Sequence, residues 1–191
     1  ANALGFMRFL QNAFADLYVQ SSQHESWILE DGIIKEGSYN IERGVGVRAV
    51  SGEKTGFAYS DELSPEALNK AAMAARSISG TGGSTKIAPL QGQEERALYT
   101  SSNPLTTMIE QDKIALLRAV DEYIRKQQPD VSQVIVSLTG VYEEVLVVAT
   151  DGTFSTDKRP LIRLNCSVLL ELDGRRERGA AGMGGRYPYE L

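Results

Sequence analysis

Apolar and polar positions alternate with a period of two along much of this chain, which is the pattern of half-buried β-strands. An early example is Val45, Val47 and Ala49, which alternate with Gly46 and Arg48. The longest alternation has an apolar face of Ile162, Leu164, Cys166, Val168 and Leu170 and a polar face of Arg163, Asn165 and Ser167. These segments predict strands with one face in the core.

Two further apolar segments predict strands in the middle of the chain. Val134, Val136 and Leu138 share one face of the first. The second, from Val145 to Ala149, is a continuous apolar run, which is typical of a strand covered on both faces. From these patterns we expect a core within one sheet that contains Leu17, Val19, Val47, Val145, Val147, Leu164 and Val168.

Tight turns are indicated wherever glycine follows a polar residue between strand patterns. Asp31-Gly32 is a strong two-residue hairpin signal, because both positions of that turn need positive φ. Asp151-Gly152 and Asp173-Gly174 predict two more turns, and the run from Ser51 to Lys54 predicts a fourth.

Helical periodicity interrupts the strands at three places. Leu4, Phe6, Met7, Leu10 and Phe14 predict a short helix at the start. Ser64-Pro65-Glu66 starts a second, with a capping hydroxyl, a proline at the first position and an acid near the positive end of the helix dipole. Its narrow apolar stripe should lie close against a sheet and consists of Leu68, Ala71, Ala72, Ala75 and Ile78.

The third predicted helix follows Thr107-x-x-Glu110, a sequence that fits a capping box. Its inward residues are Ile114, Leu117, Val120 and Ile124, and it should end before Pro129. Between the second and third helices, the segment from Ser79 to Thr85 reads as a surface loop. The fold class is therefore α/β of the α+β type, with a mixed, mainly antiparallel sheet and two principal helices packed on it.

Composition narrows the class of protein. A chain of 191 residues, 42% of them hydrophobic, suits one domain or two small ones. The net charge of −5 argues against nucleic acid as a partner. No apolar run approaches the roughly 20 residues that span a bilayer, so no membrane is implied. A lone cysteine, Cys166, fits a reducing compartment, so we expect a cytoplasmic protein.

Candidate catalytic groups are few. A metallopeptidase helix needs a second histidine beyond His24-Glu25, but His24 is the only histidine, and the segment reads as a strand. Serine–histidine or cysteine–histidine catalysis would need that same side chain. Paired carboxylates could do acid–base work, but the candidate acids flank turns or are expected to face solvent: Glu30, Asp31, Glu36, Glu42, Glu143 and Glu144. We therefore expect no catalytic residue and no metal site or cofactor in this chain.

The segment from Gly174 to Arg186 is rich in glycine and arginine. Glycines allow a ligand to approach the backbone closely, and arginines can hold a carboxylate or a peptide carbonyl. The residues expected to face a substrate or partner are Arg178, Gly182, Gly184, Gly185 and Arg186. The alternative is a hairpin end followed by a flexible connector with solvated arginines.

Several motifs, taken in order, carry a family resemblance. The densest stretch runs from Asp16 to Tyr59 and contains His24-Glu25-Ser26-Trp27, Gly44-Val45-Gly46-Val47-Arg48 and Thr55-Gly56-Phe57-Ala58-Tyr59. Later motifs are Ala149-Thr150-Asp151-Gly152-Thr153, Arg159-Pro160-Leu161, Arg176-Glu177-Arg178-Gly179 and Gly184-Gly185-Arg186. Together they closely resemble the TldD/PmbA family of metallopeptidases, once labelled modulators of DNA gyrase, and within it the TldD branch.

The resemblance implies a cytosolic zinc metallopeptidase that cleaves peptides or unfolded proteins and works as a heterodimer with a TldE/PmbA-like paralogue. The zinc motif of that family, His-Glu-x-x-x-His, is absent from this sequence. We therefore expect residues 1–191 to be the non-catalytic amino-terminal domain of a longer protein, truncated before the metal domain and helping to enclose its active site. The alternative is a non-proteolytic module that acts on DNA gyrase or an antitoxin.

Overall fold

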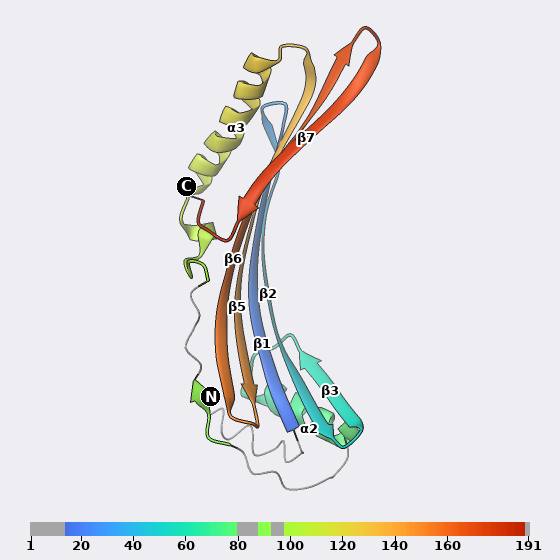
Figure 1. Ribbon diagram of the computed structural model, residues 1–191, viewed down its shortest axis with the longest axis vertical. Helices are drawn as coiled ribbons and strands as arrows, with labels where there is room; N and C mark the ends of the chain where they lie inside the picture. The colour runs from blue at the N-terminus through green and yellow to red at the C-terminus, as the bar shows by residue number, and fades with distance from the viewer. Residues whose placement is uncertain (1–13, 80–87, 93–97, 190–191) are drawn as a thin grey trace. The chain divides into compact units, whose positions relative to one another are not determined.

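The computed structural model describes residues 14–79, 88–92 and 98–189. They form one seven-stranded sheet with the strand order β3-β2-β1-β5-β6-β4, to which β7 is added through β6 (Figure 1). The strands are β1 (Phe14–Glu30), β2 (Ile33–Ser51), β3 (Lys54–Ser60), β4 (Gln91–Gly92), β5 (Val131–Ala149), β6 (Thr153–Leu172) and β7 (Arg175–Gly185). The helices are α2 (Pro65–Ser79) and α3 (Glu110–Gln127), with a 3-10 turn η1 (Pro104–Thr106).

The predicted fold class is confirmed. β2 pairs with β3, and β6 with β7, in antiparallel register, whereas the short β4 runs parallel to β6.

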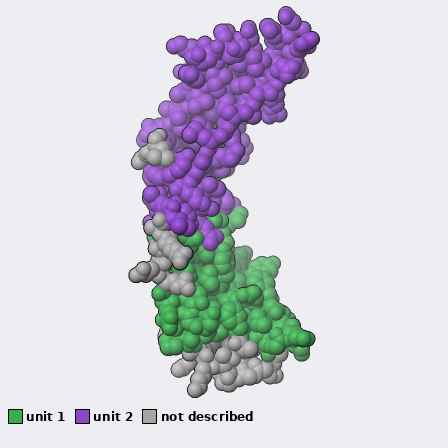
Figure 2. Space-filling model, in the orientation of Figure 1, with its two compact units in different colours: residues 1–22, 42–96, 143–158 green, residues 23–41, 97–142, 159–191 purple. Residues whose placement is uncertain are grey.

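The chain divides into two compact units, coloured separately in Figure 2. Unit 1 comprises residues 1–22, 42–96 and 143–158, and unit 2 comprises residues 23–41, 97–142 and 159–191. The long strands contribute to both units.

The core of unit 1 forms where α2 packs on the sheet. The Ser64 hydroxyl accepts a hydrogen bond from the Ala67 backbone N–H (3.1 Å), which confirms the predicted cap. Small side chains on α2 let the helix approach closely, and the buried cluster consists of Ala15, Leu17, Val45, Val47, Ala49, Ala71, Ala72, Ala75 and Val148. The prediction was wrong for Ile78, which is 57% exposed in the last turn of α2.

Strand β5 corrects another expected core position. Val148 is fully buried against the α2 side of the sheet, whereas Val147 is only half-buried. Successive strand residues point to opposite faces, so the continuous apolar run concealed which of the two valines faces the helix. Val19, Leu164 and Val168 are likewise only partly buried, and the last two pack in the core of unit 2.

Unit 2 is built around the hairpin of β1 and β2 and the helix α3. Asp31 (φ 50°) and Gly32 (φ 77°) form the predicted turn, and Asp173 (φ 51°) and Gly174 (φ 76°) form the turn between β6 and β7. The core cluster consists of Leu29, Leu105, Leu117, Val131, Val134, Val136, Leu138, Tyr142, Ile162 and Tyr189.

The predicted capping box of α3 is wrong. Ile109 occupies the N-cap position and makes no side-chain capping hydrogen bond. The Thr107 hydroxyl instead donates to the carbonyl of Pro104 (2.9 Å), because a 3-10 turn capped by Asn103 precedes the helix. The predicted end of α3 before Pro129 is confirmed.

A charged pair lies inside the core of unit 2. Lys113 Nζ is 2.8 Å from both carboxylate oxygens of Glu25 and donates a third hydrogen bond to the carbonyl of Leu105 (2.9 Å). The indole N–H of Trp27 also donates to Glu25 (2.6 Å). The side chains of Lys113 and Glu25 are only 4% and 8% exposed. Because they are buried, the ammonium group depends on partners within the protein, and its three hydrogen bonds satisfy all three of its hydrogens.

Two predicted elements lie outside the described residues: the opening helix, apart from Phe14 at the start of β1, and most of the loop from Ser79 to Thr85. In the described part of the chain, no helix has both the length and the apolar character needed to cross a membrane.

Candidate functional site

The glycine- and arginine-rich segment forms the edge strand β7. It is paired with β6 over its whole length, from Leu172↔Arg175 to Ile162↔Gly185. The hairpin in the alternative is confirmed, whereas these residues form a paired strand in place of a flexible connector. Among the strands that the structure describes, only β6 pairs with β7. The outer edge of β7 thus presents backbone N–H and C=O groups that no described strand satisfies.

The two faces of the β6–β7 hairpin differ in character. Leu164, Cys166 and Val168 point into the core beneath α3. Alternation places Arg163, Asn165 and Ser167 on the opposite face, together with their partners on β7, Gly184, Gly182 and Ala180. We call this second face the open face, because α3 and η1, the described helical elements of unit 2, both pack on the other one.

A shallow groove of about 300 Å³ lies on the open face. Its lining includes Ile135, Ser137, Arg163, Asn165, Ser167 and Gly182. The Arg163 Nε donates to Asn165 Oδ1 (2.7 Å), which fixes both side chains at the surface. We call this the β7 groove. It joins hydroxyl, amide and guanidinium groups, all able to donate hydrogen bonds, to a strand edge of small residues.

The glycines of β7 are required by close contacts within the chain itself. A Cβ at Gly182 would lie 2.4 Å from Asn165 Oδ1, and one at Gly184 would lie 2.3 Å from the carbonyl oxygen of Ile162. A Cβ at Gly185 would lie 2.1 Å from the Tyr187 ring. Gly182 therefore creates the space in which Asn165 lies across the strand, and this shapes the β7 groove.

The two predicted arginines lie in different environments. Arg178 pairs in register with Leu169 and shares the open face with Gly182. Arg186 follows the end of β7, where its guanidinium stacks 5.1 Å from the centre of the Tyr99 ring and donates to the carbonyl of Pro160 (3.4 Å). The structure thus brings Arg178, Gly182 and Gly184 to one face and holds Arg186 against other parts of unit 2.

The described residues do not fit a metal ion. His24 and Glu25 are adjacent in β1, so their side chains point to opposite faces of the strand. Both oxygens of Glu25 are already bonded to Lys113. Within residues 14–79, 88–92 and 98–189, no three His, Cys, Asp or Glu side chains are grouped to hold a metal.

Cys166 is not an activated nucleophile. Burial, and to a smaller extent the Asp121 carboxylate, raises the pKa of its thiol. The reactive thiolate is therefore rarer than for a free cysteine at neutral pH. This agrees with a packing role under α3.

Sequence reasoning missed two sets of residues. Arg163, Asn165 and Ser167 were recognised only as the polar face of a strand, although this alternation beside a strand of small residues was the available signal for the β7 groove. The pair Glu25 and Lys113 was also missed. The available signal was a charged residue at an inward position of each element. Glu25 lies on the same strand face as Trp27 and Leu29, and Lys113 lies four residues before Leu117 on the same helix face.

Two segments of the chain match models of known protein domains. Residues 15–79 match the family model described as PmbA/TldA metallopeptidase domain 1, and residues 103–191 match the PmbA/TldA metallopeptidase central domain. A protein named metalloprotease TldD homolog from Haemophilus influenzae is 52% identical over 176 residues. That alignment covers 91% of this chain but 36% of the relative, so the chain spans about a third of the relative's length.

Solved structures share the fold at low sequence identity. A Bacteroides thetaiotaomicron protein described as a modulator of DNA gyrase superposes with a TM-score of 0.74 at 14% identity, over 99% of this chain and 44% of that one. TldE from Thermococcus kodakarensis gives a TM-score of 0.72 at 14% identity, over 96% and 42%. With its two family domains and this close curated relative, the chain belongs to the PmbA/TldD metallopeptidase family.

Proposed function

We propose that this chain is the non-catalytic amino-terminal part of a TldD-like zinc metallopeptidase, and that its open face holds the peptide substrate. The single observation that carries the proposal is the outer edge of β7, which no described strand covers, beside the β7 groove. Family membership supports the reaction class, and the share of the H. influenzae relative that lies beyond the alignment leaves room for a metal domain. We propose a cytoplasmic location on the same grounds.

The edge of β7 suits an extended peptide of variable sequence. A strand added to a sheet edge gains its affinity from backbone hydrogen bonds, which do not depend on side-chain identity. From Gly179 to Gly182 the side chains are hydrogen atoms or methyl groups, so they leave the approach to the edge unobstructed. Asn165 and Arg163 in the β7 groove would then bind polar groups of the peptide on the open face.

We propose that part of this surface contacts a partner subunit. TldE from T. kodakarensis has the same fold as this chain, which is compatible with a pair of related subunits. We propose a heterodimer with a TldE/PmbA-like paralogue, in which Arg178, Gly182, Gly184, Gly185 and Arg186 face the substrate channel or the partner. Zinc would be held outside this chain, where it would polarise the scissile carbonyl and activate water.

The alternative is a non-proteolytic module acting on DNA gyrase or an antitoxin. Its support is the name of the B. thetaiotaomicron protein as a modulator of DNA gyrase. In the complete protein, peptide hydrolysis abolished by chelation and restored by zinc would favour the peptidase. Gyrase inhibition that survives chelation would favour the alternative.

Proline substitutions in β7 test the proposed edge. Successive N–H groups of a strand point to opposite edges. Of the two variants Ala180→Pro and Ala181→Pro, one therefore removes an N–H that points to the outer edge of β7, and we call it the outward variant. The other, the inward variant, removes an N–H that is hydrogen-bonded to β6. In the complete protein assembled with its paralogue, we expect the outward variant to keep its melting temperature and to lose at least tenfold in kcat/KM for peptide cleavage. The inward variant should lower the melting temperature.

Arginine variants separate the open face from the rest of unit 2. Arg178→Ala should reduce cleavage or assembly, and Arg118→Ala, at an exposed position of α3, is the matched control. Arg186→Ala should also weaken function, because it removes the guanidinium that stacks on Tyr99 and bonds to the carbonyl of Pro160 at the end of β7. If both proline variants and both β7-side arginine variants assemble and cleave like the parent, β7 is only a structural edge.

A further inference from the structure

Strand β3 lies at an edge of the sheet in unit 1. It ends the strand order, and among the strands that the structure describes only β2 pairs with it, over its whole length (Figure 1). Ser51 and Lys54 flank a two-residue turn and bond to each other across it. By alternation, Thr55, Phe57 and Tyr59 direct their backbone N–H and C=O groups to the outer edge of β3.

The outer edge of β3 lacks the features by which most edge strands avoid pairing. Native edges are blocked by charged side chains, by proline or by β-bulges. The register of β3 with β2 is unbroken, and residues 55–60 include neither a charged residue nor a proline. The edge strand β7, in contrast, carries four consecutive charged residues, Arg175, Arg176, Glu177 and Arg178. Strand β3 is therefore suited to pair with another strand.

The face of β3 away from α2 is aromatic. Ala58 packs on the core beneath α2, so alternation places Phe57 and Tyr59 on the opposite face, where they are 58% and 81% exposed. The Phe57 ring lies over Gly46 of β2. A strand added outside β3 would therefore lay its own side chains against Tyr59 and the outer side of Phe57.

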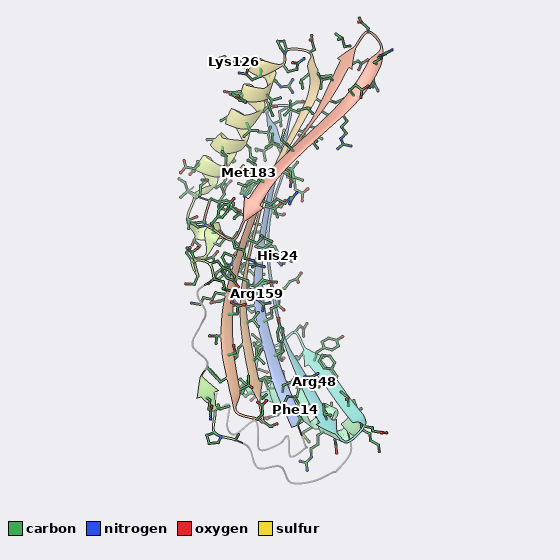
Figure 3. All side chains as sticks on the ribbon, in the orientation of Figure 1. Phe14, His24, Arg48, Lys126, Arg159 and Met183 are labelled. Carbon is green, nitrogen blue, oxygen red and sulfur yellow. The ribbon has the colours of Figure 1, made fainter. Side chains whose placement is uncertain are left out.

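The cation opposite Phe57 on β2 is turned away from this edge. Arg48 pairs in register with Phe57, but its Nε donates to Asp16 (2.9 Å) and its guanidinium lies 5.8 Å from the centre of the Phe14 ring (Figure 3). Asp16 and Phe14 both belong to β1, which lies on the other side of β2 from β3. The charge of Arg48 is therefore compensated away from the outer edge of β3.

The two ends of β3 carry opposite charges. Lys54 begins the strand, and Asp61 and Glu62 follow its last residue; all three side chains are exposed. In an antiparallel pair, the start of one strand lies beside the end of the other. A second copy of β3 would therefore bring each lysine next to the acidic residues of the other copy, and opposite charges placed in this way stabilise the pair.

We propose that β3 pairs antiparallel with β3 of a second copy of this chain, across a two-fold axis at Ala58, so that the two sheets join into one. In this register Phe57 of each copy lies opposite Tyr59 of the other, and Lys54 lies opposite Glu62. Since Phe57 and Tyr59 both direct their backbone groups outward, each such pair exchanges two hydrogen bonds, and the rings form cross-strand pairs. Every contact occurs twice, because a two-fold interface uses the same patch on both copies.

The charges select this register over its neighbours. A shift of two residues in one direction would place Glu53 opposite Asp61, which is a repulsive pair. The same shift in the other direction would place Lys54 opposite the uncharged Ser64. The proposed interface lies in unit 1 and does not use β7, so it stands whether or not β7 binds substrate.

Disulfide crosslinking of the complete protein, alone and together with its paralogue, tests the register. At the axis, residue 58 of one copy faces residue 58 of the other as a non-hydrogen-bonded pair. Their Cα atoms are then about 4.5 Å apart, within reach of a disulfide. Under mild oxidation we expect Ala58→Cys to form a covalent dimer that the parent does not form. Thr55→Cys is the matched control, because its two copies would be roughly 20 Å apart along the strands.

Sedimentation of the complete protein without its paralogue measures the strength of self-association at low salt. Lys54→Glu opposes two carboxylates in each pair and should weaken dimerisation at least tenfold. The double variant Lys54→Glu with Glu62→Lys exchanges the charges and should restore the parent's dissociation constant to within threefold. Tyr59→Lys should also weaken dimerisation at least tenfold, whereas Tyr123→Lys, at an exposed tyrosine of α3, should leave it unchanged.

Several results, in variants that keep the parent's melting temperature, would overturn the proposal. They are a complete protein that stays monomeric, equal crosslinking of Ala58→Cys and Thr55→Cys, and a charge exchange that fails to restore association. Loss of the Ala58→Cys crosslink when the paralogue is added would also overturn it, because the paralogue would then be the partner at this edge.

Discussion

Val148→Asp is expected to unfold unit 1. Val148 is fully buried between the sheet and the alanine face of α2, so an aspartate there would place an unpaired charge in the core. Such a burial costs several kcal/mol, against a total stability of about 5–15 kcal/mol for a domain. The measurement is limited proteolysis with a circular-dichroism melt, in which cleavage within α2 should become rapid.

The neighbouring residue is the matched control for this variant. Val147 is only half-buried and points to the opposite face of β5, where an aspartate can reach solvent. Val147→Asp should therefore lose much less stability than Val148→Asp. Equal losses, or a larger loss at Val147, would mean that β5 has the other register against α2.

Lys113→Met is expected to destabilise unit 2 by about 3–5 kcal/mol, because it leaves the Glu25 carboxylate buried without its counter-charge. Methionine keeps the length and apolar stem of the side chain, so packing changes little. The Trp27 hydrogen bond alone cannot replace three contacts of a buried ammonium. Urea unfolding at pH 7, with the slope checked for a constant m-value, measures the change.

Two comparisons separate the charge effect from packing. The double variant Glu25→Gln with Lys113→Met removes both charges and should recover at least half of the lost stability, since a neutral amide still accepts from Trp27. Arg48→Met breaks the ion pair between Arg48, which is 50% exposed, and Asp16. The loss of stability should be under about 1 kcal/mol, because an exposed ion pair contributes little. If Lys113→Met is no worse than Arg48→Met, the buried pair contributes little.

Local signals in the sequence predicted the turns and one helix start well. Asp31-Gly32 and Asp173-Gly174 both adopt positive φ, because two-residue hairpins admit few other residues. The Ser64 cap is equally local and was also confirmed. The Thr107 cap failed because Pro104 and Asn103 form a competing turn that uses the same hydroxyl.

Features that depend on pairing between distant segments could not be predicted. Strand register decides whether Val147 or Val148 faces α2. A continuous run of apolar residues does not show the register, because both faces of the strand are then apolar. The β7 groove combines β5, β6 and β7, and its shape rests on the contact between Gly182 and Asn165. The glycine pattern identified the right segment. It suggested a flexible segment, whereas the structure has a paired strand there.

Hydrogen exchange on the complete protein, with and without an uncleavable peptide, tests the proposed substrate edge most directly. Outward-pointing amides of an edge strand exchange readily until another strand accepts their hydrogen bonds. We predict that the peptide slows exchange at alternate amides between Arg178 and Gly184, and that the proline variant with the outward donor removed abolishes this protection. Unchanged exchange throughout β7, with protection of another surface at saturating peptide, would contradict the account.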